Sequence, residues 1–283
     1  MSETLVSLWT SARRRLEAAG VDSPVLDARL LLEAGAGVSR LDIVTDPRRA
    51  VTAEQAAAVD ALVLRREARE PIGHILGKKA FWTLDLKVGP DVLSPRPETE
   101  LLVEVAMETL AKDQSALVLD LGVGSGAILL AVLSERPLAR GVGVDASEAA
   151  LAIARHNAEL HGLTDRVTLQ RGDWAEGIEG PFDLILSNPP YIPSADIAGL
   201  EPEVAKHEPR LALDGGADGL DPYRRIVAAL PRLLSPEGTF AFEVGIGQAT
   251  AVQALAEAAG FVTATPRLDL SGIARVVSGR RAA

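Results

Sequence analysis

Residues 117–126 read LVLDLGVGSG, and this stretch indicates the architecture of the larger part of the chain. Its first four residues form an apolar run typical of a buried strand, and a helical pattern through about Leu133 follows the glycines. A strand that passes through a glycine-rich turn into a helix is the beginning of a βαβ unit, whose strands are parallel. Glycine allows positive φ angles, so such a turn can also approach a ligand closely.

The alternation of strands and helices continues to the end of the chain. Further strands are predicted at 141–145, 167–169, 182–186, 239–244, near 262 and at 275–277, with helices at 147–161, 223–234 and 248–259. This order predicts an α/β fold with a mostly parallel, Rossmann-like sheet covered by helices on both faces. Ligands of such sheets bind at the carboxyl ends of the strands, near the switch in strand order.

The first 70 residues have a different, helical pattern. Apolar residues recur at helical spacing over 5–19, Ser23 and Pro24 begin a second helix that the 35–37 stretch breaks, and Thr52 begins a third with Gln55 as a capping box. Residues 81–88 alternate, and Val92-Leu93 is expected to pair back with them as a hairpin. We therefore predict a helical domain for partner recognition at 1–72, a hairpin linker at 73–95 and a ligand-binding domain at 96–283.

Composition excludes several classes of protein. The net charge of the 283 residues is −10, which disfavours sequence-independent binding of nucleic acid. The chain has no cysteine, no apolar run long enough for a membrane span, and no basic-then-apolar start typical of a secretory signal. We expect a cytoplasmic monomer with no membrane association, no metal and no direct contact with nucleic acid. Hydrolase chemistry is not indicated, because a Gly-x-Ser-x-Gly elbow is missing.

Three features, each after a successive predicted strand, suggest a pocket for an adenosyl group. The turn Gly122-Val123-Gly124-Ser125-Gly126 has neither the P-loop nor the dinucleotide spacing. Asp145 ends the next strand, where a carboxylate can accept hydrogen bonds from both ribose hydroxyls. Asp173 and Trp174 follow the third strand, where Asp173 could accept a hydrogen bond from an adenine amine and Trp174 could cover the adenine ring. Taken singly, the features could be a tight turn, a favourable charge at a helix start and a core aromatic.

The segment Asn188-Pro189-Pro190-Tyr191 follows the fourth strand and indicates the reaction. Two prolines remove two backbone donors and stiffen the chain, which leaves the Asn188 side-chain oxygen and the Pro189 carbonyl as acceptors. Two acceptors can hold both hydrogens of an NH₂ group and aim its nitrogen at an electrophile, while Tyr191 offers a flat face to a planar group. The alternative interpretation is a rigid turn without a ligand.

The sequence resembles the HemK-type family, the glutamine N5-methyltransferases of peptide chain release factors. The similar segments lie in order along nearly the whole chain, at 71–77, 94–100, 120–126, 187–192, 208–213 and 218–220. The resemblance implies a helical domain that helps dock a release factor, S-adenosylmethionine as cofactor, and methyl transfer to the glutamine of a Gly-Gly-Gln loop. It also implies that residues 122–126, Asp145 and Trp174 contact the cofactor, and that residues 188–191 contact the glutamine.

The sequence departs from the family pattern at His74, at Ser94 and in the polar pair before Arg275, which concerns local packing and docking. The roles of Arg96, Glu98 and Glu100 stay open between a pocket mouth and structural ion pairs. Two rival functions remain: an adenine N6-methyltransferase acting on nucleic acid, which shares Asn-Pro-Pro-Tyr, and a non-catalytic protein that binds adenosylmethionine. The acidic charge disfavours the first, and the Asn-Pro-Pro-Tyr segment beside an intact glycine turn disfavours the second.

Overall fold

The computed structural model describes residues 3–282, which form two compact units. The first contains residues 3–77 and the short segment 201–207, and the second contains residues 78–200 and 208–282. Because residues 1 and 2 lie outside the described range, the prediction for the start of the chain is only partly covered. The predicted division into domains at 72 and 95 stays a prediction.

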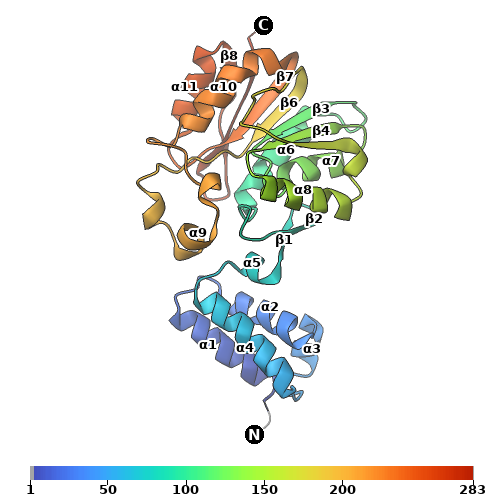
Figure 1. The fold of residues 1–283 in the computed structure, drawn as a ribbon, viewed down its shortest axis with the longest axis vertical. Coiled ribbons are helices and arrows are strands. Elements are labelled where there is room, and N and C mark those ends of the chain that lie inside the picture. Colours follow the sequence, from blue (N-terminus) through green and yellow to red (C-terminus); the bar gives the residue numbers. More distant parts are fainter. Residues whose placement is uncertain (1–2, 283) are drawn as a thin grey trace. The chain divides into compact units, whose positions relative to one another are not determined.

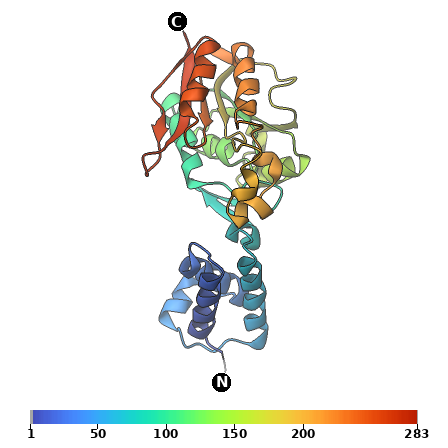
Figure 2. The same ribbon diagram turned by 90° about the vertical axis from the view of Figure 1, so that its left-hand side faces the viewer.

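The first unit is helical, and α1, α2 and α4 contact one another around its apolar core (Figure 2). Its helices are α1 (Leu5–Ala18), α2 (Pro24–Ala36), α3 (Arg40–Thr45), α4 (Ala53–Glu67), α5 (Ile72–Leu76) and α9 (Pro202–His207). The 35–37 stretch ends α2 as predicted, although the helix continues past Glu33 to Ala36 and is capped by Gly37 with φ 63°. Gly35 is needed for packing: a Cβ there would lie 2.7 Å from the Cα of Val59 on α4.

The starts of α2 and α4 allow a matched test of helix capping. The Thr52 hydroxyl accepts the Gln55 N–H and the Gln55 side chain accepts the Thr52 N–H, whereas Ser23 makes no side-chain capping bond. We expect Thr52→Ala to lower the free energy of unfolding of this unit by about 1 kcal/mol, and Ser23→Ala to leave it nearly unchanged. Hydrogen exchange of the α4 amides would measure both variants. Equal effects of the two substitutions would contradict the capping assignment.

The α9 segment belongs to the first unit through a buried group of ion pairs. Arg66 Nε lies 2.7 Å from Asp27 Oδ2, and its Nη1 lies 2.9 Å from Glu203 Oε1, which Arg69 Nε also contacts at 2.6 Å. Arg66 and Asp27 are almost fully buried, so each charge needs its partner. Helix α9 was not predicted from the sequence, because its six residues are too short for a periodic pattern.

The linker contains a hairpin, but between other strands than predicted. Strand β1 (Lys78–Phe81) pairs antiparallel with β2 (Leu84–Lys87), and Trp82 with φ 54° lies in the turn between them. The expectation that Val92-Leu93 pairs back is wrong. Instead, Val92 is buried with Val88 and Ala150, and Leu93 lines the pocket described below.

The second unit is built on a mixed sheet with the order β5-β4-β3-β6-β7-β10-β8, with β9 paired to β10. Its strands are β3 (Leu117–Leu121), β4 (Arg140–Asp145), β5 (Val167–Arg171), β6 (Phe182–Ser187), β7 (Leu234–Glu243), β8 (Phe261–Thr263), β9 (Arg267–Leu268) and β10 (Ala274–Arg281). The first five pair in parallel, whereas β10 is antiparallel to β7, β8 and β9. This confirms the expected α/β fold with a mostly parallel sheet.

Helices cover both faces of this sheet (Figure 1). One apolar core contains side chains of α6 (Glu100–Thr109), α7 (Ala127–Glu135) and α8 (Glu148–Leu160), and the other contains those of α10 (Asp221–Leu233) and α11 (Ala249–Ala258). The buried face of α7 is apolar over nearly its whole length, as a helix between a sheet and its neighbours requires. Across residues 3–282, no helix combines the length and apolar character of a membrane span.

Candidate active site

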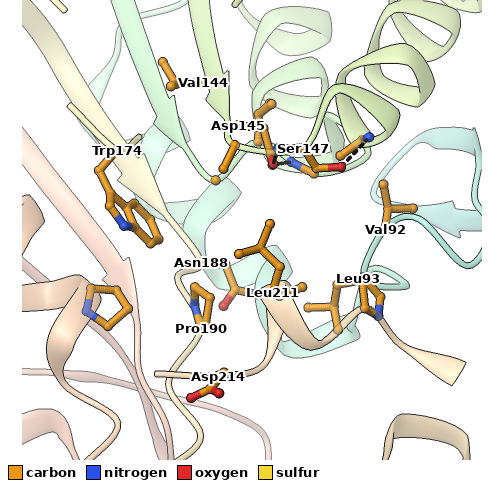
Figure 3. A pocket seen from close by; sticks show the side chains of 18 of the residues that line it. Val92, Leu93, Val144, Asp145, Ser147, Trp174, Asn188, Pro190, Leu211 and Asp214 are labelled. Carbon is orange, nitrogen blue, oxygen red and sulfur yellow. Dashed lines mark hydrogen bonds between the residues drawn. The ribbon is translucent and has the colours of Figure 1, made fainter. Parts of the chain in front are cut away.

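A pocket of about 610 Å³ lies at the carboxyl ends of β3, β4, β5 and β6, in the size range of small-molecule sites. In the sheet order the chain moves outward from β3 to β4 and β5 on one side, and to β6 and β7 on the other. The switch in strand order therefore falls between β3 and β6, where a ligand crevice is expected. Figure 3 shows Asp145, Trp174 and Asn188, which lie at or just after the carboxyl ends of three different strands, around this pocket.

The glycine turn after β3 needs its glycines. Gly122, Gly124 and Gly126 have φ angles of 78°, 53° and 85°, a region that residues with a Cβ rarely adopt. A Cβ on Gly126 would also lie 2.9 Å from Leu130 on α7. Of the turn, residues 122–125 line the pocket and Gly126 does not. Gly126 therefore allows the chain to turn into α7, while the residues before it face the cavity.

Asp145 lines the pocket and also supports the glycine turn. Its Oδ2 accepts the Gly124 N–H at 2.9 Å, and its Oδ1 accepts the Ser147 N–H at 2.9 Å. Each carboxylate oxygen can accept more than one hydrogen bond, so both remain able to bind ligand hydroxyls. The carboxylate thus joins the turn after β3 to the start of α8.

Asp173 and Trp174 line the pocket after β5 together with Arg225, which the sequence analysis did not single out. Asp173 Oδ2 lies 2.6 Å from Arg225 Nη2, and both side chains are about half exposed. Trp174 has φ 55°, so its backbone is held in the left-handed region that is unusual for a large residue. The ion pair engages one oxygen of the Asp173 carboxylate, so the other stays available to an adenine amine.

The Asn-Pro-Pro-Tyr segment lies directly after β6, but only part of it faces the cavity. Asn188 and Pro190 line the pocket, whereas Pro189 is buried and Tyr191 packs against the α10–α11 core. Burial raises the pKa of Tyr191 to about 12. The Tyr191 carbonyl accepts the Gln248 amide at 2.9 Å, which fixes the chain after the motif. The roles predicted for Pro189 and Tyr191 stay predictions.

Two segments complete the wall that the sequence analysis left undefined. Residues 209–216 pair with the chain after Tyr191, since Gly215 N donates to Ile192 O at 2.9 Å and the Ser194 hydroxyl donates to Asp214. Leu211, Asp214 and Gly216 line the pocket from this segment (Figure 3 labels the first two). The resemblance had drawn attention to 208–213 without a role for it.

The second segment is the loop before α6. The Glu208 carboxylate is fully buried, accepts the Ser94 N–H at 3.0 Å and lies 3.2 Å from the Arg96 guanidinium. Arg96 also lines the pocket, so it has both of the roles left open above. Glu100 accepts the Trp82 N–H at 2.8 Å and does not line the pocket.

Two acids close to the strand ends titrate unusually. Asp120, at the end of β3, is fully buried, and burial raises its pKa to about 7, with a further contribution from the charge of Asp145. Glu243, at the end of β7, is 2% exposed, and burial likewise raises its pKa to about 7. Neither lines the pocket, and neither was predicted as a site residue.

A sheet with this strand order, with a glycine turn after β3 and an acid at the end of β4, defines a class I methyltransferase fold. The solved methyltransferase from Pyrococcus furiosus shares this fold, with a TM-score of 0.53 at 19% identity over 78% of this chain and 96% of that one. The family models "PrmC N-terminal domain" and "Methyltransferase small domain" match residues 7–77 and 97–201.

Curated relatives identify the family. The release factor glutamine methyltransferase of Caulobacter vibrioides is 52% identical over 99% of this chain and 97% of its own length. The protein of the same name from Rhodospirillum rubrum is 51% identical over 95% of this chain and 82% of its own. The chain belongs to the release factor glutamine methyltransferase family, which confirms the resemblance found in the sequence.

Proposed function

We propose that this protein transfers a methyl group from S-adenosylmethionine to the side-chain amide nitrogen of the glutamine in the Gly-Gly-Gln motif of peptide chain release factors. One observation carries the proposal: Asn188 lines the same pocket as the glycine turn and Asp145. An acceptor for an NH₂ group and acceptors for ribose hydroxyls thus share one cavity. Membership of the family supports this choice of substrate.

The residues of the pocket fit this cofactor. The backbone of residues 122–124 can approach a ligand without side-chain obstruction at Gly122 and Gly124, and Asp145 can accept from the ribose hydroxyls. Trp174 can cover the adenine. The lining has five carboxylates, at Asp91, Asp145, Asp173, Asp214 and Asp221, against two guanidiniums, at Arg96 and Arg225. An excess of negative charge favours a cationic ligand.

When bound, S-adenosylmethionine supplies an electrophilic methyl group on a sulfonium. The amide nitrogen of glutamine is a weak nucleophile, because its lone pair is delocalised into the carbonyl. Asn188 Oδ1 accepts one hydrogen of the NH₂ group from the cavity, which polarises the group and aims its nitrogen. The Pro189 carbonyl is the second acceptor predicted from the sequence, and it would have to reach the substrate from a residue that does not line the pocket. Positioning and electrostatics therefore contribute most of the rate enhancement. The proton leaves the nitrogen late in the methyl transfer, to solvent or to a nearby acceptor.

The release factor is the protein substrate in this proposal, and the helical first unit helps to recognise it. The match of the family model to residues 7–77 supports a role for this unit specific to the family. The rival substrate is an adenine of nucleic acid, and the acidic charge and the curated relatives both count against it. It is kept as an outcome of the test.

The test is a methyl-transfer assay with labelled cofactor. Purified release factor, the same factor with its Gly-Gly-Gln glutamine replaced by alanine, and duplex DNA are offered separately to the full chain. We expect label only on the unchanged release factor. Label on DNA would favour the adenine substrate, and label on the alanine variant would move the modified atom elsewhere. A lack of label on all three would overturn the proposed activity.

A further inference from the structure

A buried acid, Glu243, lies beside Asn188 at the carboxyl end of the neighbouring strand β7. Strands β6 and β7 pair in parallel with Ser187 opposite Phe242, so the next residues along, Asn188 and Glu243, lie side by side at the strand ends. Glu243 is 2% exposed and does not line the pocket, whereas Asn188 and Thr99 do. Glu243 is therefore placed to act on the pocket through these two residues.

Hydrogen bonds connect the three side chains. Asn188 Nδ2 donates to the Thr99 hydroxyl oxygen at 3.2 Å. The Thr99 hydroxyl and the Asn188 amide are also both within hydrogen-bonding reach of the Glu243 carboxyl, and both bonds lower its pKa. Bonds that favour the ionised form are donated to the carboxylate. The donors of Thr99 and Asn188 therefore point toward Glu243.

The hydrogen-bond donors and acceptors around Asn188 determine the orientation of its amide. An ionised carboxylate only accepts hydrogen bonds, and an amide nitrogen has two hydrogens. One goes to Thr99, and the other is available to the Glu243 carboxylate beside it, which leaves Oδ1 free to accept from a ligand in the cavity. In the flipped orientation, Oδ1 would face the carboxylate, so two acceptors would meet without a hydrogen between them, which is costly when buried.

We propose that Glu243 is a positioning residue of the methyl transfer: together with Thr99 it holds the Asn188 amide so that Oδ1 faces the substrate nitrogen. The inference rests on the proposed function, because the nitrogen to be held is that of the glutamine amide. Glu243 touches neither substrate nor cofactor in this account. It acts only by fixing which end of Asn188 faces the cavity.

The charges around Glu243 determine the pH range in which its carboxylate can orient the Asn188 amide. Burial raises its pKa to about 7, Arg275 on β10 lowers it and Glu98 raises it. Its Oε2 has no hydrogen-bond partner in the described part of the chain, in keeping with the raised pKa. Tyr191 and Tyr223, the other titratable neighbours, stay protonated at neutral pH because their pKa values are raised. As the pH falls through about 7, Glu243 gains a proton, becomes able to donate to Asn188 Oδ1, and no longer enforces one orientation.

The test compares Glu243→Gln with the wild-type chain. Gln keeps the shape but can donate to Asn188 Oδ1, so both amide orientations become possible. We expect kcat for release factor to fall about tenfold, with KM and the cofactor Kd within about twofold of wild type. The acidic limb of the kcat profile near pH 7 should disappear in the variant. Thr99→Val should lower kcat similarly, whereas Thr99→Ser, which keeps the hydroxyl, should restore it.

A second measurement separates this inference from the proposed function, because it needs no substrate. Exchange of the Asn188 side-chain amide hydrogens with solvent, followed by ¹⁵N NMR, should be slow in wild type and faster in Glu243→Gln. Unchanged exchange, an unchanged kcat, or a fall in kcat matched by the loss of thermal stability would overturn the role of Glu243. If the wild-type chain labels no release factor but exchange responds as expected, the proposed substrate fails and the positioning of Asn188 stands.

Discussion

Asn188→Ala is expected to lower kcat by about a hundredfold or more while the cofactor Kd stays nearly unchanged. The substitution removes the acceptor that faces the cavity and leaves the glycine turn and Asp145 in place. Since the lost contact orients the nitrogen for transfer, the effect belongs to the chemical step more than to binding. Single-turnover kinetics with saturating cofactor would measure it, and calorimetric titration would give the Kd.

Ser187→Ala is the matched control for this experiment. Ser187 precedes Asn188, but its hydroxyl donates to Leu121 O at 2.6 Å within the sheet and does not line the pocket. We expect this variant to lose about 1 kcal/mol of stability with turnover within about twofold of wild type. If Asn188→Ala kept wild-type turnover, or if both variants lost turnover equally, the assignment of Asn188 as the acceptor for the NH₂ group would be wrong.

Asp145→Ala should weaken cofactor binding by roughly 1–3 kcal/mol, which is a rise in Kd of about fivefold to 150-fold. The carboxylate accepts from ribose hydroxyls in the proposed complex and from the N–H groups of Gly124 and Ser147 in the free protein. Its loss therefore removes ligand contacts and also loosens the glycine turn. Fluorescence or calorimetric titration with S-adenosylmethionine and with its demethylated product would measure the change.

Glu148→Gln tests the other interpretation of Asp145, as a favourable charge at the start of α8. Glu148 lies in the first turn of the same helix, with a side chain 59% exposed and paired to Arg155. If a negative charge at the helix start were all that mattered, both variants would change the Kd alike. We expect Glu148→Gln to bind the cofactor as wild type does. An unchanged Kd in Asp145→Ala would remove Asp145 from the cofactor site.

Local patterns in the sequence were enough for the α/β class and for one side of the pocket. The apolar runs at 117–120 and 182–186 were recognisable as strands because buried parallel strands are apolar on both faces. The glycine turn, Asp145 and Asn188 directly follow such strands, and carboxyl ends of parallel strands meet at one edge. Their convergence on one pocket could therefore be expected from chain order alone, as the structure confirms for Asn188 and Asp145.

Other features depend on residues far apart in the chain. The sequence did not indicate that β10 inserts antiparallel between β7 and β8, that residues 209–216 form a wall of the pocket, or that 201–207 join the first unit. The error at Val92-Leu93 has a different, local origin: the strand at 84–87 has a short neighbouring segment on each side, at 78–81 and at 92–93, and its alternating pattern does not decide which of them pairs with it.

The group formed by Thr99, Asn188 and Glu243 shows most clearly which features follow from local sequence and which depend on the fold. That Asn188 follows a strand and precedes two prolines is local information, and it could be read from the order of residues alone. The orientation of its amide depends on the folded chain, because Thr99 and Glu243 reach Asn188 from η1 (Pro97–Thr99) and β7, 89 residues before it and 55 after it. The pairing of β6 with β7 creates that contact, and its energy exists only when the sheet has formed and water has been excluded from the carboxylate.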